Sequence, residues 1–378
     1  MNPGRMPRAV RHRSHWRGIT AILAVALVIR LVFLFAVVPQ LDNGVLHKSD
    51  SADFDRMAWA IASANTSYSD YGEPLILYYM AAIYRVAGHR PAAVAGSNVV
   101  LSVLTCLGVY VLTRRLFGRS AALWAALGFA LYPEAIYWSV FPLKEALIAP
   151  LVVWSAVCAV KAVRDRSAIG VVGFALLLAG LYFARPPWVV CPIALLLVAM
   201  LVWWRGWRRW AIPLAVIGVV LALWLAVPAV RQAVDRSLPS VVWDSVAQES
   251  VSIDEATDTG IGTLAVHVLA GGVRFWRLIP EGYGVWGRVL APFVATLYLL
   301  FALGTLRSLV WLSRGREVLL LALPLILMTF LFGAVAPFVR YRYPLLVLLL
   351  PVVGTGKVFL LICVRRVPRL IRAARTNP

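Results

Sequence analysis

Three aspartates lie close together in the stretch HKSDSADFDR, which spans residues 47 to 56. Asp50, Asp53 and Asp55 fall within a run of six residues, and a carboxylate held beside a hydroxyl or amine can take up its proton during a reaction. The simpler interpretation is a solvated acidic loop that only keeps the protein surface soluble. We favour the chemical interpretation and expect this stretch to carry a catalytic carboxylate.

A pair of arginines near the C-terminus forms a second candidate group. Arg340 and Arg342 lie in FVRYRYP, directly before the last long apolar stretch, and the planar fork of a guanidinium can grip two phosphate oxygens at once. Alternatively, both side chains only reach a membrane interface beside Tyr341 and Tyr343. Cations with weaker claims are Lys144 in PLKEA, Arg185 in ARPPW, and Arg274 and Arg277 in RFWRLIP.

Two roles stay open for each of Arg30, Glu145 and His47. Arg30 falls near the middle of an apolar stretch, where an unpaired charge costs about 3 kcal/mol or more, so it should face the protein interior. It could pair with an acid such as Glu145 or Asp50, or it could contact a phosphate. Glu145 could position a substrate or pair with Lys144 or Arg30. His47 could help to bind a divalent ion, although a lone loop histidine is more often a surface residue.

The composition places these residues in a membrane protein. The chain is 61% hydrophobic and 14% charged, whereas soluble domains are roughly one-half apolar and one-quarter charged. A net charge of +20 could indicate nucleic-acid binding in a soluble protein, but here the charge alternates from loop to loop, so we expect no nucleic-acid partner. The cysteines lie in or beside apolar stretches without ligand spacing, and we interpret all of them as core residues: Cys106, Cys158, Cys191 and Cys363.

About ten apolar stretches could cross a bilayer as helices. The first, residues 19–38, follows an arginine-rich tail and is long for the core of a signal peptide, so we expect a retained helix. The others are expected at 91–113, 119–138, 143–161, 168–184, 187–204, 211–229, 289–306, 317–337 and 344–362. The predicted fold class is an all-α polytopic membrane protein.

The loops between these stretches predict an orientation, because short cytoplasmic loops collect Lys and Arg. If the N-terminal tail is inside, every inside segment is strongly basic: 114–119, 161–166, 205–209, 307–316 and the tail from residue 365. Of the acidic residues, only Asp165 and Glu317 fall on that side. We therefore expect both termini in the cytoplasm and chemistry on the outer face of a plasma or inner membrane.

Two long outer loops complete the predicted organisation. The loop 39–90 contains the acidic stretch and then the apolar segment 75–87, which is too short to cross a bilayer. We expect that segment to lie at the membrane interface, anchored by tyrosines: Tyr78, Tyr79 and Tyr84. The second loop, 230–288, could hold another interfacial helix. The expected parts of the chain are a basic tail, one transmembrane domain and a second basic tail, at 1–18, 19–364 and 365–378.

The order of several motifs resembles the GT-C superfamily of polyprenyl-phosphate-dependent glycosyltransferases, which includes protein O-mannosyltransferases and the aminoarabinose transferase of lipid A. An arginine in the first helix, Arg30, is followed by SDSADF, GEPLILYYMAAIYRVAG, LTRRLFGR, ALYPEAIYWS and LKEAL. The likeness covers roughly residues 19 to 165, and it returns in VRYRYPLL, which is similar to an RY-x-x-P element of the family. The large soluble C-terminal domain of some members is absent, so we expect the outer loops to recognise the acceptor.

This resemblance implies a GT-C-like fold and an integral membrane glycosyltransferase. Its donor would be a polyprenyl-phosphate sugar, carried on decaprenyl or undecaprenyl phosphate in a bacterium. Its acceptor would be a cell-envelope glycan, lipid or protein at the extracytoplasmic face. A divalent metal is compatible with this chemistry but is not required by the sequence, so the cofactor stays unknown.

The resemblance also assigns roles to individual residues. Asp50 occupies the position of the first-loop acid, four residues before Phe54, where the family more often has Tyr. We expect Asp50 to be the general base and Asp53 its reserve. The donor phosphate would be held by Arg340, Arg342 and Arg30. Support for the acceptor would come from Glu145, Lys144, Arg185 and Tyr341.

Other classes of function stay open beside the glycosyltransferase. A polysaccharide polymerase or ligase would also take prenyl-linked donors, but it would depend on outer-loop arginines more than on an aspartate. A transporter or flippase would be expected to show paired repeats and mid-membrane polar residues, whereas the polar residues here gather at one face. An inactive relative that serves as an assembly partner is a further alternative.

Overall fold

A computed structural model of the chain describes residues 8–41, 44–46, 49–64, 74–203, 295–307, 315–335, 343–358 and 361. Every regular element within these ranges is helical, which agrees with the predicted all-α class. The expected span at 211–229 and the second outer loop, 230–288, lie outside the described residues. The structure therefore bears on the first outer loop and on most of the expected spans.

The first span is longer than expected and changes its winding at the end. Helix α1 (Arg8–Val32) continues as a π-helix, η1 (Phe33–Val37), and a 3-10 helix, η2 (Val38–Gln40). The part from residue 17 to 40 is apolar and long enough to cross a membrane. Six of its large apolar side chains are exposed, as expected for a helix that borders lipid on one side: Val25, Leu27, Val28, Val32, Phe35 and Val37.

Three consecutive helices of the bundle begin or end at proline and glycine residues. Helix α4 (Pro91–Phe117) begins with a proline, which lacks the N–H that would be unpaired at that position. It ends at Gly118, whose φ of 91° opens a turn into α5 (Arg119–Leu131). The expected span 119–138 is not one helix, because it breaks at Tyr132. The residue before a proline avoids helical geometry, and Pro133 starts a new short helix, α6 (Pro133–Trp138).

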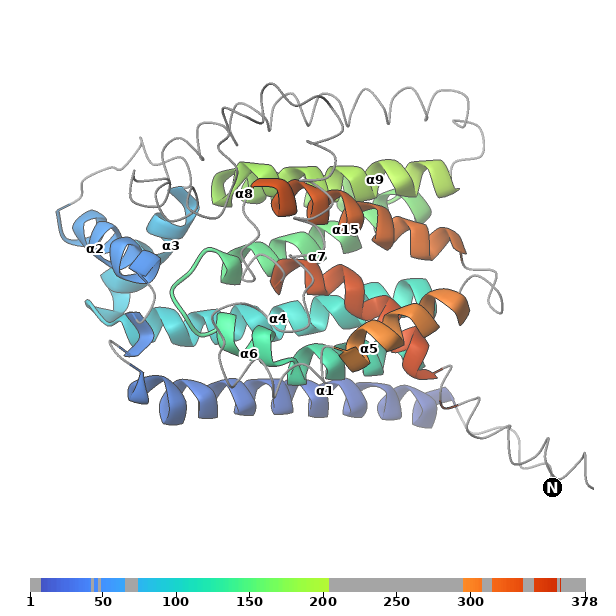
Figure 1. Cartoon of the computed structure of the whole chain (residues 1–378), viewed down its shortest axis with the longest axis horizontal. Coiled ribbons are helices and arrows are strands. Elements are labelled where there is room, and N and C mark those ends of the chain that lie inside the picture. The colour runs from blue at the N-terminus through green and yellow to red at the C-terminus, as the bar shows by residue number, and fades with distance from the viewer. Residues whose placement is uncertain are drawn as a thin grey trace, which may run out of the picture.

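The remaining helices complete the bundle. Helix α7 (Glu145–Arg164) is followed by α8 (Ala168–Ala184), whose first turn is capped by Ser167 Oγ accepting from the Gly170 N–H. A 3-10 helix, η4 (Pro186–Val189), then leads into α9 (Val190–Trp203). Later in the chain come a helix at Ala295–Arg307, α15 (Gly315–Val335) and a helix at Tyr343–Val358. In Figure 1, α1, α4, α7, α8 and α9 run side by side along the long axis.

The first outer loop forms two helices at one end of this bundle. Helix α2 (Ser49–Ala64) and helix α3 (Pro74–Ala87) pack against each other and lie at the left-hand end in Figure 1. The sequence predicts a loop for the acidic stretch, but the structure places residues 49–56 of it in the first two turns of α2. Serine and aspartate suit a helix start, because they favour its positive end and its unpaired N–H groups.

The two ends of the bundle carry different side chains. The last turns of α4 and α7 bring Arg114, Arg115, Lys161 and Arg164 to one end, beside the start of α1 (Figure 1). There, Arg115 Nη1 lies 2.6 Å from Asp165 Oδ2, and Arg164 donates to the Arg115 carbonyl. The opposite end holds α2, α3, α6 and the first turn of α7. In the part of the chain that the structure describes, the basic turns and the acidic helix α2 lie at different ends, and the side of the membrane that each end faces stays a prediction.

Candidate functional site

Asp50 lies in the first turn of α2, where it is half-buried. Phe54, one turn later, is 3% exposed, and residues four apart project from the same side of a helix. Asp50 therefore lies on the side of α2 that meets the rest of the protein. Asp53 faces away, because its carboxylate pairs with Arg56 at 2.5 Å and both side chains are largely exposed. Between the two candidate bases, this geometry favours Asp50.

Phe54 connects α2 to the loop before α7. The Lys144 ammonium lies 5.7 Å from the centre of the Phe54 ring, a cation–π contact. Lys144 and Glu145 are both buried, and Glu145 is the first residue of α7, where the helix dipole favours a negative charge. Arg185, the residue before η4, places Nη1 3.9 Å from Glu145 Oε1. Three predicted support residues thus lie together, and one of them reaches the acidic helix.

Hydrogen bonds from α4 and α3 hold the irregular segment that carries Lys144 in place. Asn98 of α4 is fully buried and donates from Nδ2 to the Phe141 carbonyl at 2.7 Å. Its Oδ1 accepts from the Tyr79 hydroxyl of α3 at 3.0 Å, and the same hydroxyl lies 2.5 Å from Ser97 Oγ. Because an unpaired buried carbonyl is costly, the Asn98 amide stabilises this non-helical turn. Burial raises the pKa of Tyr79, so its hydroxyl stays protonated.

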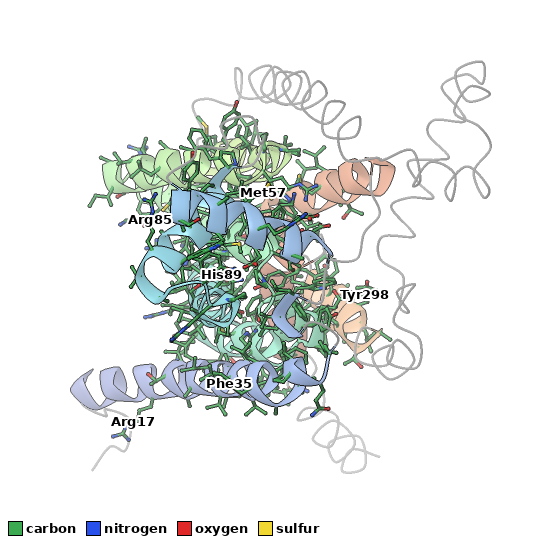
Figure 2. All side chains as sticks on the ribbon, turned by 90° about the vertical axis from the view of Figure 1, so that its left-hand side faces the viewer. Arg17, Phe35, Met57, Arg85, His89 and Tyr298 are labelled. Carbon is green, nitrogen blue, oxygen red and sulfur yellow. The ribbon has the colours of Figure 1, made fainter. Side chains whose placement is uncertain are left out.

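Asp55 belongs to a separate cluster on another side of α2. Its buried carboxylate accepts a hydrogen bond from the Tyr84 hydroxyl, and His89 Nε2 lies 3.1 and 3.0 Å from its two oxygens. The His89 ring stacks on Trp59 with centroids 4.7 Å apart. Figure 2 looks onto this end of the molecule, where Met57, Arg85 and His89 are labelled. Burial and the Asp55 bond raise the pKa of Tyr84, which keeps it a donor.

Sequence reasoning did not find His89 or the roles of Tyr79 and Tyr84. All three expected interfacial tyrosines were treated alike, but only Tyr78 is exposed, at 44%, while Tyr84 is 1% exposed. The three tyrosines lie on different sides of α3, because successive residues of a helix are turned by about 100° from one another, so their spacing could have distinguished them. Tyr84 and Tyr79 project into the protein, so the prediction of interfacial anchoring fits Tyr78 alone.

Arg30 is fully buried, as its mid-span position required, and it binds neutral groups. Its Nε donates to Ser102 Oγ at 2.7 Å, and its Nη1 donates to the carbonyls of Ala26 and Ala130 at 3.1 Å. Its Nη2 donates to the Phe129 carbonyl at 3.3 Å. Because α5 ends at Leu131, the guanidinium satisfies carbonyls that a helix end leaves unpaired. These bonds favour a structural role over contact with a donor phosphate.

Several predicted residues lie outside the described part of the chain: Arg340, Arg342, Tyr341 and His47. Tyr343, which follows the arginine pair, is described and fully buried, and it stacks near Phe129 with centroids 6.1 Å apart. Among the described residues, no three His, Cys, Asp or Glu side chains lie close enough together to hold a metal ion. Glu134, in the first turn of α6, is also buried.

Comparison with known families supports the resemblance to GT-C proteins. Residues 72–231 match the family model described as dolichyl-phosphate-mannose-protein mannosyltransferase, so the match runs from just before α3 past the end of α9. No curated protein sequence matches the chain significantly. The family match therefore covers the described helices that surround Lys144, Glu145 and Arg185.

Solved structures with a similar fold come from the archaeon Archaeoglobus fulgidus. Its oligosaccharyltransferase in the apo form superposes with a TM-score of 0.53 at 14% identity, over 89% of this chain and 50% of that one. The same organism's AglB, in complex with an inhibitory peptide and a dolichol-phosphate, gives 0.55 at 14% identity, over 96% and 52%. This chain thus spans about half the length of these proteins. The resemblance to the GT-C superfamily is confirmed, and the likeness shows a shared fold.

Proposed function

We propose that this chain is an integral membrane glycosyltransferase that moves a sugar from a polyprenyl-phosphate donor to a cell-envelope acceptor at the extracytoplasmic face. One observation carries the proposal. The half-buried acid Asp50 starts a helix that is joined, one turn later, to Lys144, and Lys144 is followed by Glu145 and its partner Arg185. The family match over residues 72–231 supports the same class of reaction.

The reaction needs a base and a place for negative charge. As the acceptor oxygen or nitrogen attacks C1 of the sugar, its proton passes to the Asp50 carboxylate. The bond between C1 and the phosphate oxygen breaks, and the electron pair leaves with the polyprenyl phosphate. Asp50 suits the first task, because it lies on the side of α2 that meets the protein and yet is only half-buried.

Two described cations connect to this part of the site: Lys144 lies over the Phe54 ring of α2, and Arg185 lies beside Glu145. The phosphate gains charge as the sugar departs, and fixed cations in a water-poor site stabilise such charge strongly. The Glu145 carboxylate holds Arg185 within 3.9 Å, and the Phe54 ring holds Lys144. We assign phosphate binding to these cations together with Arg340 and Arg342, whose prediction stays untested.

The proposal is tested in a strain that lacks this protein, by mass spectrometry of its prenyl-phosphate sugars and envelope glycans. We expect one prenyl-phosphate sugar to accumulate and one glycan modification to disappear, and the wild-type chain to reverse both. Asp50→Asn should fail to reverse either, because loss of a general base lowers the rate by about 10²–10⁴-fold. An unchanged profile in the deletion strain would contradict the transferase and favour a transporter.

A matched control separates loss of the base from loss of the protein. Asp165→Asn also converts an aspartate to its amide, but Asp165 pairs with Arg115 at the opposite end of the bundle. This variant should complement fully, and both variants should reach wild-type levels in the membrane. Full complementation by Asp50→Asn would exclude Asp50 as the base and favour the arginine-dependent polymerase or ligase.

A further inference from the structure

Helix α3 contacts both halves of the candidate site through two tyrosine hydroxyls. Tyr84 donates to Asp55 of α2, the helix that carries Asp50. Tyr79 donates to Asn98, whose amide donates to the Phe141 carbonyl three residues before Lys144. The two tyrosines are five residues apart on one helix, so a single rigid element holds the acidic helix and the Lys144–Glu145 segment.

We propose that Tyr79 and Tyr84 are positioning residues, which together set the placement of Asp50 relative to Lys144 and Glu145. This inference rests on the proposed function for its kinetic consequence, but the mechanical link can be tested without it. We call the link, made of Tyr79, Tyr84, Asn98 and Asp55, the α3 brace.

The Tyr84 arm of the brace fixes α2 against rotation. Asp55 is held by the Tyr84 hydroxyl on one side and by His89 on the other, and His89 is itself stacked on Trp59 of α2. Asp55 and Phe54 are adjacent, so they leave α2 in different directions. Phe54 meets Lys144 while Asp55 meets α3 and His89. Contacts in two directions define the rotation of α2 and hence the direction of Asp50.

The Tyr79 arm fixes the turn that carries Lys144. The segment from Ser139 to Lys144 lies between α6 and α7 and is fully buried, although it is not a regular helix. The Asn98 side chain accepts from Tyr79 and donates into this segment, so both ends of the amide are used. An amide without the Tyr79 donor would have one buried acceptor less well satisfied, which lowers the cost of displacing the turn.

The kinetic test uses single-atom deletions of hydroxyl groups. Tyr79→Phe and Tyr84→Phe should each lower kcat by about 10-fold, because small misplacements of reacting groups are costly, while KM for the donor stays within about 2-fold. Tyr78→Phe is the matched control, since Tyr78 lies on the same helix with its side chain 44% exposed. It should leave kcat and KM unchanged.

The double variant distinguishes a brace from two separate structural bonds. If both arms set one distance, the effects of Tyr79→Phe and Tyr84→Phe on kcat should be less than multiplicative, because either loss already frees the two halves. Their effects on the melting temperature, about 2 to 4 °C each, should instead add, as for independent sites. A lowered melting temperature with unchanged kcat, or fully multiplicative effects on kcat, would overturn the proposal.

Hydrogen exchange tests the link when no transferase activity is found. Each purified variant is compared with the purified wild-type protein. Tyr84→Phe should speed amide exchange in residues 51–64, and Tyr79→Phe should speed it in residues 139–147. Tyr78→Phe should change the exchange of neither segment. Unchanged exchange in both segments would contradict the proposed α3 brace even if the wild-type chain is active. If the wild-type chain is inactive but the variants show these exchange changes, the brace is supported and the proposed function is contradicted.

Discussion

At the scale of single residues, hydrogen bonds to neutral groups hold two buried polar side chains of the described bundle in place. Arg30 binds one hydroxyl and three carbonyls, and Asn98 connects a tyrosine to a turn. Inside a membrane protein each of these groups would otherwise lack water as a partner. Removing one donor should therefore cost more than removing a surface charge.

Arg30→Lys should destabilise the protein by about 2 kcal/mol, since an ammonium cannot reach the hydroxyl and the helix-end carbonyls together and leaves some buried acceptors unpaired. Thermal unfolding in detergent measures the effect. Arg114→Lys, at an exposed position of the opposite end, should unfold like the wild type. A normal melting temperature for Arg30→Lys with a raised donor KM would instead identify Arg30 as a phosphate ligand.

Tyr84 should make stability depend on alkaline pH. Its folded pKa is raised by burial and by its bond to Asp55, so the folded state holds the phenolic proton more tightly than the unfolded chain, whose tyrosine pKa is about 10. The stabilisation is complete below that value and is lost as pH rises above it toward the folded pKa. Melting temperatures from pH 8 to 11 should fall less steeply in Tyr84→Phe; equal slopes would contradict the assignment.

At the scale of helices, the helices at 295–307 and 343–358 pack with their backbones in close contact. A Cβ atom at Gly356 would lie 1.9 Å from the Leu300 carbonyl oxygen, and one at Gly304 would lie 2.0 Å from that of Val352. The helices at 295–307 and 343–358 therefore cross where neither has a side chain. Small residues at such crossings are typical of membrane helices, which associate by packing rather than by the hydrophobic effect.

Gly356→Ala should force these two helices apart and lower stability by about 1 to 3 kcal/mol, the usual cost of overpacking. Gly96→Ala provides the control, because a Cβ at Gly96 in α4 would meet nothing within 4 Å and alanine favours a helix interior by about 1 kcal/mol. Thermal unfolding should show opposite shifts for the two variants. A stabilising Gly356→Ala would contradict the close crossing.

Hydropathy pattern and helix propensity predicted most of the described helices, but hydropathy did not predict the breaks and buried turns between them. The start and end of α4 follow from Pro91 and Gly118, and the start of α8 follows from Ser167. The break at Tyr132 and the buried turn after α6 could not be found by hydropathy, because apolar residues continue through both. Likewise Asp50 follows from motif order, whereas the Tyr84–Asp55–His89 cluster joins residues up to 34 apart through tertiary contacts that no local pattern records.

For the whole molecule, the separation of charge between the two ends predicts which end meets the cytoplasm. The end with Arg114, Arg115, Lys161 and Arg164 carries the basic turns, and the end with α2 and α3 carries the candidate site. Basic loops are retained inside during membrane insertion. We therefore predict that the end that holds Asp50 faces outward.

Cysteine labelling should confirm this orientation. A membrane-impermeant maleimide should label Val86→Cys, at a position 90% exposed in the last turn of α3, in intact cells. It should label Arg114→Cys only after the membrane is permeabilised. The wild-type chain serves as the background, since its described cysteines are buried or partly buried. The reverse labelling pattern would place Asp50 in the cytoplasm and contradict an extracytoplasmic reaction.

The bonds of Arg30 also impose an order on biosynthesis. Its partners Ser102 and Ala130 lie 72 and 100 residues further along the chain, and ribosomes add about 5–20 residues per second. For roughly 5 to 20 seconds after α1 leaves the ribosome, α4 and then α5 are still to be synthesised. During this time the Arg30 guanidinium must therefore lie beside the insertion machinery or at the lipid surface. The first helix of this protein would thus depend on its later neighbours to settle at its final depth.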